Sequence, residues 1–215
     1  FPLDLTSLIA RENKLSIDEK GFNKALNAQK DRSRKASNIE VQDWVIVNDS
    51  KGSIFIGYDE LEADVKISKY REINQKGKIF YQLVLDKTPF YPEGGGQEGD
   101  YGNLTCDSAS HSILDTRKVG ELVIHLSSGP FEVGDMVHGE LDWARRRQLM
   151  DHHTAVHIVG GAARRLLGPH IYQAGANKSV ESARLDITHH RRLTRFDLDQ
   201  IEAVEAEVVR QVSRG

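Results

Sequence analysis

Residues 79–85 read Ile-Phe-Tyr-Gln-Leu-Val-Leu, a run of apolar, β-branched and aromatic side chains. This composition is typical of a β-strand. Similar short runs lie on both sides of it, and turn residues such as Asn48-Asp49-Ser50 separate them. Many short strands at close spacing predict a small antiparallel β-barrel, with a sandwich as the alternative. The expected strands cover residues 45–47, 53–58, 63–67, 79–85, 113–117, 121–126 and 136–141.

Helical patterns flank this strand-rich region. Ser16, followed three residues later by Glu19, is a helix-start signal near the N-terminus. Residues 144–167 predict a long helix that stops at Gly168-Pro169. Two further strands, at 171–176 and 182–188, and a helix at 196–212 follow it. The predicted class is α+β in three parts: a helical segment at 1–37, the β-barrel at 38–142 and an α/β subdomain at 143–215.

Composition places the chain among globular proteins. It has 215 residues, of which 39% are hydrophobic and 28% charged. No stretch approaches the roughly 18 apolar residues of a membrane span. Cys106 is the only cysteine, which excludes an internal disulfide and favours a reducing, cytoplasmic location. Because the chain starts at Phe1 rather than Met, we expect it to be part of a longer protein.

Positive charge is concentrated in residues 145–195. This window holds ten basic and three acidic residues, so its net charge is +7. The whole chain has a net charge of −3, and the residues outside the window therefore carry −10. Six of the nine histidines also fall in it. Such a segment can attract phosphates, although a solvated helix face balanced by acidic neighbours is the alternative.

The clearest chemical motif is His153-Thr154-Ala155-Val156-His157. On a helix, residues four apart share one face, so the two imidazoles can bind one metal ion, of which tetrahedral zinc fits best. Two histidines are half of a zinc site, and two partly exposed surface histidines are the alternative. Thr154 stands where a His-Glu-x-x-His protease has its glutamate, which disfavours a metalloprotease. The neighbouring His152 could take the place of His153 as the first histidine of the metal-binding pair.

A second motif is the run Glu93-Gly94-Gly95-Gly96-Gln97. It lacks the Gly-Lys-Ser/Thr of a phosphate-binding loop. Three glycines allow positive φ angles and close backbone approach, either to a ligand or neighbouring chain or simply in a tight hairpin turn.

Four segments together resemble the editing region of alanyl-tRNA synthetases. The stretch from Leu85 to Gly102, with its Glu-Gly-Gly-Gly-Gln run, is similar to the first signature of that family, and the His153–His157 motif is similar to its metal-binding signature. Gln173-Ala174-Gly175 and Arg184 to His189 resemble the stretch that follows. The opening Phe1-Pro2-Leu3-Asp4-Leu5-Thr6 resembles the end of the helical tRNA-recognition domain.

The resemblance implies both a function and a fold. The family's editing domain hydrolyses the ester of tRNA(Ala) wrongly charged with serine or glycine, and it joins a β-barrel to an α/β subdomain shared with threonyl-tRNA synthetases. The implied partners are therefore tRNA(Ala), Ser-tRNA(Ala) and Gly-tRNA(Ala), with no membrane. The parent enzyme attaches alanine to tRNA(Ala), and ATP would be used only in a catalytic domain outside this chain.

The resemblance also implies the site residues. His153 and His157 would be ligands of Zn2+, with the remaining ligands, a Cys-x-x-x-His motif, expected beyond Gly215. The other implied residues lie near the editing pocket, and Thr88 would recognise the hydroxyl of serine. These residues are Thr88, Gln97, Gln173, Arg184 and His189.

Three alternatives stay open at this point. The chain could be a free-standing trans-editing relative, for which the segment at 1–37 has no use. It could be a tRNA-binding module without catalysis, because half of the metal site is absent. It could also be a metal-binding protein of β-barrel and helices with no affinity for nucleic acid.

Overall fold

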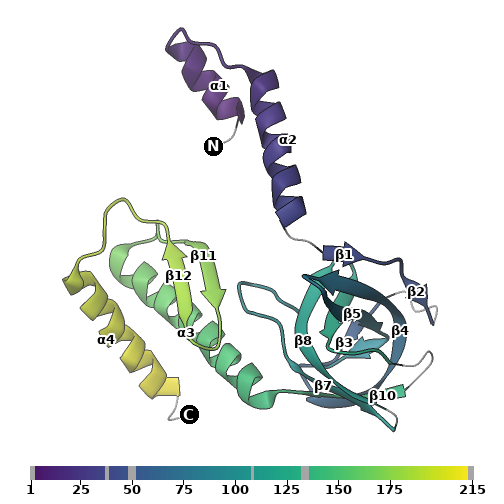
Figure 1. The fold of residues 1–215 in the computed structure, drawn as a ribbon. Helices are drawn as coiled ribbons and strands as arrows, with labels where there is room; N and C mark the ends of the chain where they lie inside the picture. Colours follow the sequence, from purple (N-terminus) through teal and green to yellow (C-terminus); the bar gives the residue numbers. More distant parts are fainter. Residues whose placement is uncertain (1–2, 37–38, 48–51, 108, 132–135, 213–215) are drawn as a thin grey trace. The chain divides into compact units, whose positions relative to one another are not determined.

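The computed structural model describes residues 3–36, 39–47, 52–107, 109–131 and 136–212 (Figure 1). The chain divides into two compact units. The first comprises Phe1–Glu40 with Asn74–Lys78, and the second comprises Val41–Ile73 with Ile79–Gly215. No helix of the described residues is long and apolar enough to cross a membrane.

The first unit contains helices α1 (Leu3–Glu12) and α2 (Glu19–Ala36). Both helices were expected, but the predicted cap was wrong. The Oδ1 atom of Asp18, not Ser16, accepts a hydrogen bond from the Gly21 backbone N–H at 2.8 Å. A carboxylate at this position both satisfies an unpaired amide and complements the positive helix N-terminus, which explains why Asp18 takes the role.

An eight-stranded sheet forms most of the second unit. Its strands pair in the order β1-β4-β10-β7-β8-β9-β5, with β2 added to β4. Because β5 also pairs with β4, the pairings from β4 to β5 run round a ring. The strands are β1 (Ile39–Val41), β2 (Val45–Ile46), β4 (Glu62–Gln75), β5 (Lys78–Leu85), β7 (Gly102–Cys106), β8 (Ala109–Val119), β9 (Leu122–Ser127) and β10 (Met136–Leu141).

The core of this sheet follows from residues that alternate along each strand. On β4, Ala63, Val65 and Ile67 are buried, while the residues that precede each of them, Glu62, Asp64 and Lys66, are exposed. These side chains join a cluster that includes the fully buried Phe90 and Leu104. The period-two pattern therefore predicted which face of β4 points inward.

Two strand predictions differ from the structure. The run expected at 53–58 is reduced to β3 (Ile54–Phe55), which pairs in parallel with β6 (Lys87–Thr88). Strand formation ends before Gly57, where an added Cβ would lie 2.0 Å from the Pro89 carbonyl oxygen. Strand β7 was not clearly predicted, since its sequence Gly-Asn-Leu-Thr-Cys mixes turn formers with strand formers.

The C-terminal elements are helix α3 (Trp143–Leu167), strands β11 (Gln173–Lys178) and β12 (Ala183–Ile187), and helix α4 (Arg195–Val212). The two strands form an antiparallel hairpin, and α3 contacts both strands and α4 (Figure 1). Their small core contains Ala162, Ala163, Ile171 and Ile201. With four helices and a large antiparallel sheet in the described residues, the predicted mixing of helices and strands is confirmed.

One buried ion pair fixes α3 against the loops of the sheet. The Arg146 guanidinium donates from Nε to the Asp100 carboxylate at 2.8 and 3.0 Å, and Nη2 donates to the same group. Its remaining donors reach the backbone carbonyls of Gly57 at 2.8 Å and Pro89 at 2.9 Å. Asp100 Oδ2 also accepts from the Tyr91 N–H at 2.8 Å. Four chain segments are thereby joined at one buried guanidinium.

Replacing Arg146 with methionine should lower the free energy of unfolding by about 3–5 kcal/mol, because a buried carboxylate loses its partner. Arg147→Met is the matched control, since the neighbouring arginine makes only an exposed 3.3 Å pair with Asp151 and should contribute less than about 1 kcal/mol. Urea unfolding followed by circular dichroism measures both. Similar losses for the two variants would contradict the anchoring role of Arg146.

Candidate functional site

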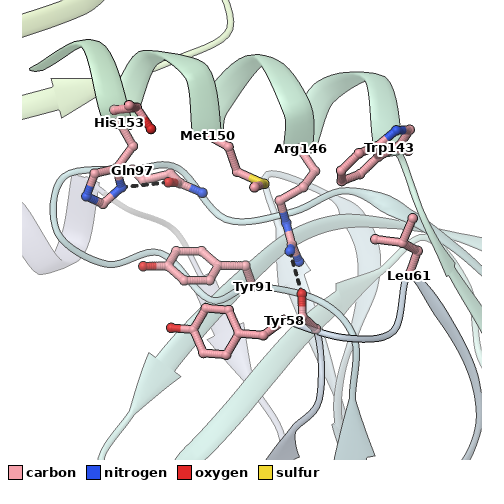
Figure 2. Close-up of a pocket in the computed structure, with 10 residues that line it drawn as sticks. Tyr58, Leu61, Tyr91, Gln97, Trp143, Arg146, Met150 and His153 are labelled. Carbon is pink, nitrogen blue, oxygen red and sulfur yellow. Dashed lines mark hydrogen bonds between the residues drawn. The ribbon is translucent and has the colours of Figure 1, made fainter. Parts of the chain in front are cut away.

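A cavity of about 300 Å³ lies between the N-terminal half of α3 and the loops of the sheet. In Figure 2, Arg146, Met150 and His153 project from α3 toward it, and Tyr58 and Tyr91 face them. Arg146, Met150 and His153 are four and three residues apart, which puts them on one face of a helix. The lining residues are Gly57, Tyr58, Leu61, Tyr91, Gln97, Trp143, Arg146, Met150, His153 and Thr154.

A hydrogen bond between Gln97 and His153 joins the two sequence motifs at this cavity. The two side chains lie 2.8 Å apart, Nδ1 to Oε1 (Figure 2). Because the amide oxygen only accepts, Nδ1 of His153 carries the proton, and Nε2 keeps its lone pair. Gln97 is 3% exposed and His153 is half-buried, so this bond is partly shielded from water.

The glycine-rich run explains how Gln97 reaches that position. Gly94 and Gln97 exchange backbone hydrogen bonds in a tight turn. Gly96 has a φ of +78°, and a Cβ there would lie 2.3 Å from the Ala176 carbonyl oxygen. The tight turn is therefore confirmed, while the close approach is to β11 of the same chain rather than to a ligand or a neighbouring chain.

Lys178 secures the same loop from β11. Its backbone N–H donates to the Gly96 carbonyl, and its Nζ donates to the Gly95 carbonyl, each at 2.6 Å. The side chain is 1% exposed, and burial lowers the pKa of its ammonium group. Lys178 thus places a buried positive charge beside the loop that carries Gln97.

The surroundings of His153 favour its neutral form. Burial lowers the pKa of His153, and the charges of Lys178 and His157 lower it further. The His153 and His157 rings are stacked, with centroids 5.1 Å apart and planes 23° apart. A neutral imidazole with a free Nε2 is able to bind a metal or accept a proton.

His153 and His157 fit half of a zinc site. A histidine that binds a metal through one ring nitrogen usually donates its other N–H to an oxygen, as His153 does to Gln97. Among the residues that the structure describes, no third His, Cys, Asp or Glu completes a metal-ligating group with this pair. His152 does not replace His153, because its ring nitrogens face the Ser179 carbonyl oxygen at 2.7 Å and the Gln148 amide at 2.9 Å.

Thr88 lies inside the core rather than at this cavity. Its side chain is fully buried, and its Oγ1 is 2.8 Å from Nε2 of His125. Nδ1 of His125 faces the Leu83 carbonyl at 3.3 Å and so carries the ring proton. The Thr88 hydroxyl therefore donates to His125, while its oxygen accepts from the Phe90 N–H at 3.1 Å.

The other three implied residues also lie away from the cavity. Gln173 begins β11, and Arg184 lies on β12, 3.3 Å from the Asp186 carboxylate; both are exposed. His189 follows β12 and contacts His170 and His190. Of the seven residues implied by the resemblance, the structure brings together Gln97, His153 and His157.

Most of the positive window is neutralised locally. Six of its ten basic residues form ion pairs with carboxylates: Arg145, Arg146, Arg147, Arg184, Arg191 and Arg195. Arg191 and hydrogen bonds from Thr194 hold the pKa of Asp197 far below its usual range. The alternative of a balanced surface therefore describes much of this segment.

Sequence reasoning missed Tyr58, Tyr91 and Lys178. Tyr58 lies in a loop without a motif, and Tyr91 lies within the signature stretch from Leu85 to Gly102 but was not singled out there; only folding brings both opposite α3. Lys178 was counted as one of the basic residues of the window. The strand predicted at 171–176 ended two residues before Lys178, so its place in β11 was missed.

Comparison with known proteins identifies the class. The family described as tRNA synthetases class II (A) matches residues 1–145. The chain therefore belongs to the class II tRNA synthetase family.

The individual relatives are alanine--tRNA ligases, as the sequence signatures predicted. Those from Parabacteroides distasonis and Cytophaga hutchinsonii are each 40% identical over 98% of this chain. The one from Christiangramia forsetii is 40% identical over 99%. These matches cover 24–25% of the relatives, so the chain spans about a quarter of their length.

The buried His125 should make stability fall with acidification. Burial lowers the pKa of His125 to about 4, from an ordinary value of 6.5. Between these values the unfolded chain binds the proton and the folded chain does not, so stability decreases as the pH falls. The 2.5-unit difference corresponds to about 2–3 kcal/mol by pH 4.5.

Urea unfolding of the wild type and of His125→Gln at pH 7.5 and pH 4.5 tests this. The variant should lose about 2–3 kcal/mol less than the wild type on acidification, because glutamine does not titrate. If the two proteins lose the same free energy of unfolding between pH 7.5 and pH 4.5, His125 does not cause the loss of stability in acid.

Proposed function

We propose that this chain carries the editing site of an alanyl-tRNA synthetase, which hydrolyses the ester of Ser-tRNA(Ala) and Gly-tRNA(Ala). The observation that carries the proposal is the Gln97–His153 hydrogen bond at the wall of the cavity, since it unites the two family signatures. The longer protein would attach alanine to tRNA(Ala) with ATP, in a part outside this chain.

The need for such a site follows from the limits of a binding pocket. A pocket shaped for alanine cannot reject glycine by size, and it rejects an added hydroxyl by only about 10²-fold. A second site that hydrolyses the wrong products removes both errors. This reasoning favours hydrolysis over a role in binding alone.

The cavity has the size and lining expected for the end of a charged tRNA. Its volume of about 300 Å³ lies at the lower end of ligand pockets, which suits an aminoacyl group and adjoining sugar. Tyr58 and Trp143 line it and are exposed, and aromatic side chains of this kind stack on nucleic acid bases. Arg146 also lines it, but its bonds to Asp100 make it part of the framework.

Residues of the chain would hold the reacting groups in place. His153 and His157 would hold zinc, with further ligands from outside this chain. When bound, the ion supplies a positive charge that polarises the ester carbonyl or a water molecule. Gln97 fixes the ring orientation of His153 through a hydrogen bond that is part-buried.

Thr88 enters the proposal only through a rearrangement. Its hydroxyl already donates to His125. Its oxygen accepts one hydrogen bond, from the Phe90 N–H, so a serine hydroxyl could donate to the remaining lone pair only if the fully buried side chain became accessible. The net free energy at stake in one such hydrogen bond is about 0.5–1.5 kcal/mol.

One observation supports a second candidate, a tRNA-binding module without catalysis. In the described part of the chain, His153 and His157 lack a third metal ligand. In that case this chain alone would bind tRNA(Ala) and leave the ester intact.

Serine release from Ser-tRNA(Ala) tests the proposal in the full-length synthetase that contains this chain. His157→Ala should slow the release by at least about 100-fold, a typical effect of losing a group that assists proton transfer or holds a metal. His138→Ala is the control, because that exposed histidine pairs with Asp64 on the sheet and should leave the rate unchanged.

The same variants should bind uncharged tRNA(Ala) as the wild type does. Unchanged serine release in His157→Ala would contradict the site assignment. If the wild-type protein binds tRNA normally but releases no serine, the hydrolase proposal is wrong and the second candidate, a tRNA-binding module, takes its place.

A further inference from the structure

A second group of histidines lies outside the cavity. His170 follows α3, while His189 and His190 follow β12. Each offers one ring nitrogen, and these three atoms all lie within 4.8 Å of one another. In the described residues this is the one set of three His, Cys, Asp or Glu side chains close enough to share a metal ion.

Backbone contacts hold the two segments that carry these histidines together. The Thr188 N–H donates to the Tyr172 carbonyl at 2.9 Å, and the Tyr172 N–H donates to Thr188 Oγ1 at 2.8 Å. The Thr188 hydroxyl donates to the His170 carbonyl at 2.7 Å. The cluster is therefore set by the pairing of β11 and β12, and not by long flexible side chains meeting at the surface.

The ring arrangement leaves a polar atom without a partner. The His170 and His189 rings are stacked at 5.1 Å, with Nε2 of His170 and Nδ1 of His189 2.8 Å apart. Nε2 of His189 is shielded from solvent and forms no hydrogen bond. A buried polar atom without a partner is rare in folded proteins, and a bound ion or water is one usual explanation.

We propose that His170, His189 and His190 form a binding site for a divalent transition-metal ion of the zinc class. Imidazole nitrogens suit zinc, copper, nickel and iron, whereas calcium and magnesium prefer oxygen. Zinc with nitrogen ligands at about 2.0–2.1 Å requires the nitrogens to lie roughly 3.3 Å apart. Nitrogens already within 4.8 Å reach that spacing through small ring rotations.

The site has three protein ligands and an open side. His170 and His190 are exposed, so a fourth position is accessible to water. Three protein ligands plus water is the arrangement of open zinc sites, while structural sites are closed by four. The site is separate from the pair His153 and His157, which lies within α3, and it does not rest on the proposed editing function.

Zinc binding to this 215-residue chain tests the proposal. Dialysis against Zn2+, followed by elemental analysis, gives the bound equivalents, and competition with a chromophoric chelator gives the affinity. His170→Asn and His190→Asn should each weaken binding of one equivalent at least tenfold. Both residues are exposed, and thermal unfolding without metal verifies that the variants fold.

Two control variants separate this site from other histidines. His111→Asn replaces a histidine of β8 outside the cluster, and this variant should still bind one equivalent of Zn2+. The double variant His153→Asn, His157→Asn should also retain it. The proposal is overturned if His190→Asn binds Zn2+ as the wild type does, or if the equivalent disappears in the double variant.

Discussion

The geometry of the candidate site depends on the buried pair of Arg146 and Asp100. The guanidinium binds Asp100 and the carbonyls of Gly57 and Pro89, and Asp100 also holds the backbone of Tyr91. Rotation or sliding of α3 would break several of these bonds at once. His153 lies seven residues, or two helical turns, after Arg146, so fixing Arg146 also fixes the direction in which His153 points.

The glycine-rich loop supplies the second half of the same geometry. Only a glycine at position 96 lets the loop lie against β11, because a Cβ would collide with the Ala176 carbonyl. Lys178 then bonds two successive carbonyls of that loop. Gln97 is thus fixed from β11 while His153 is fixed from α3, and their hydrogen bond forms between two constrained partners.

Local sequence patterns predicted the helices and strands better than the contacts between residues far apart in the sequence. Helix 144–167 and strand 79–85 were found almost to the residue, since hydrophobic periodicity is a property of neighbours in sequence. Gln97 and His153 were each named through a family signature, but their contact spans 56 residues. Arg146 was counted as a surface charge because its partner lies 46 residues upstream. The cluster around His170 was missed for the same reason.

The pairing of charges would limit the binding of RNA under the proposed function. A basic residue already held by a carboxylate releases fewer counterions from a phosphate, and six of the ten in the window are so held. Arg164, Arg165 and Arg192 are exposed and form no ion pair among the described residues, which provides three phosphate contacts at most from these positions. Three contacts correspond to a salt exponent of only about 2.1–2.7. Recognition of a tRNA end at this site would then come chiefly from stacking and hydrogen bonds in the cavity, where the aromatic rings and the His153 imidazole are.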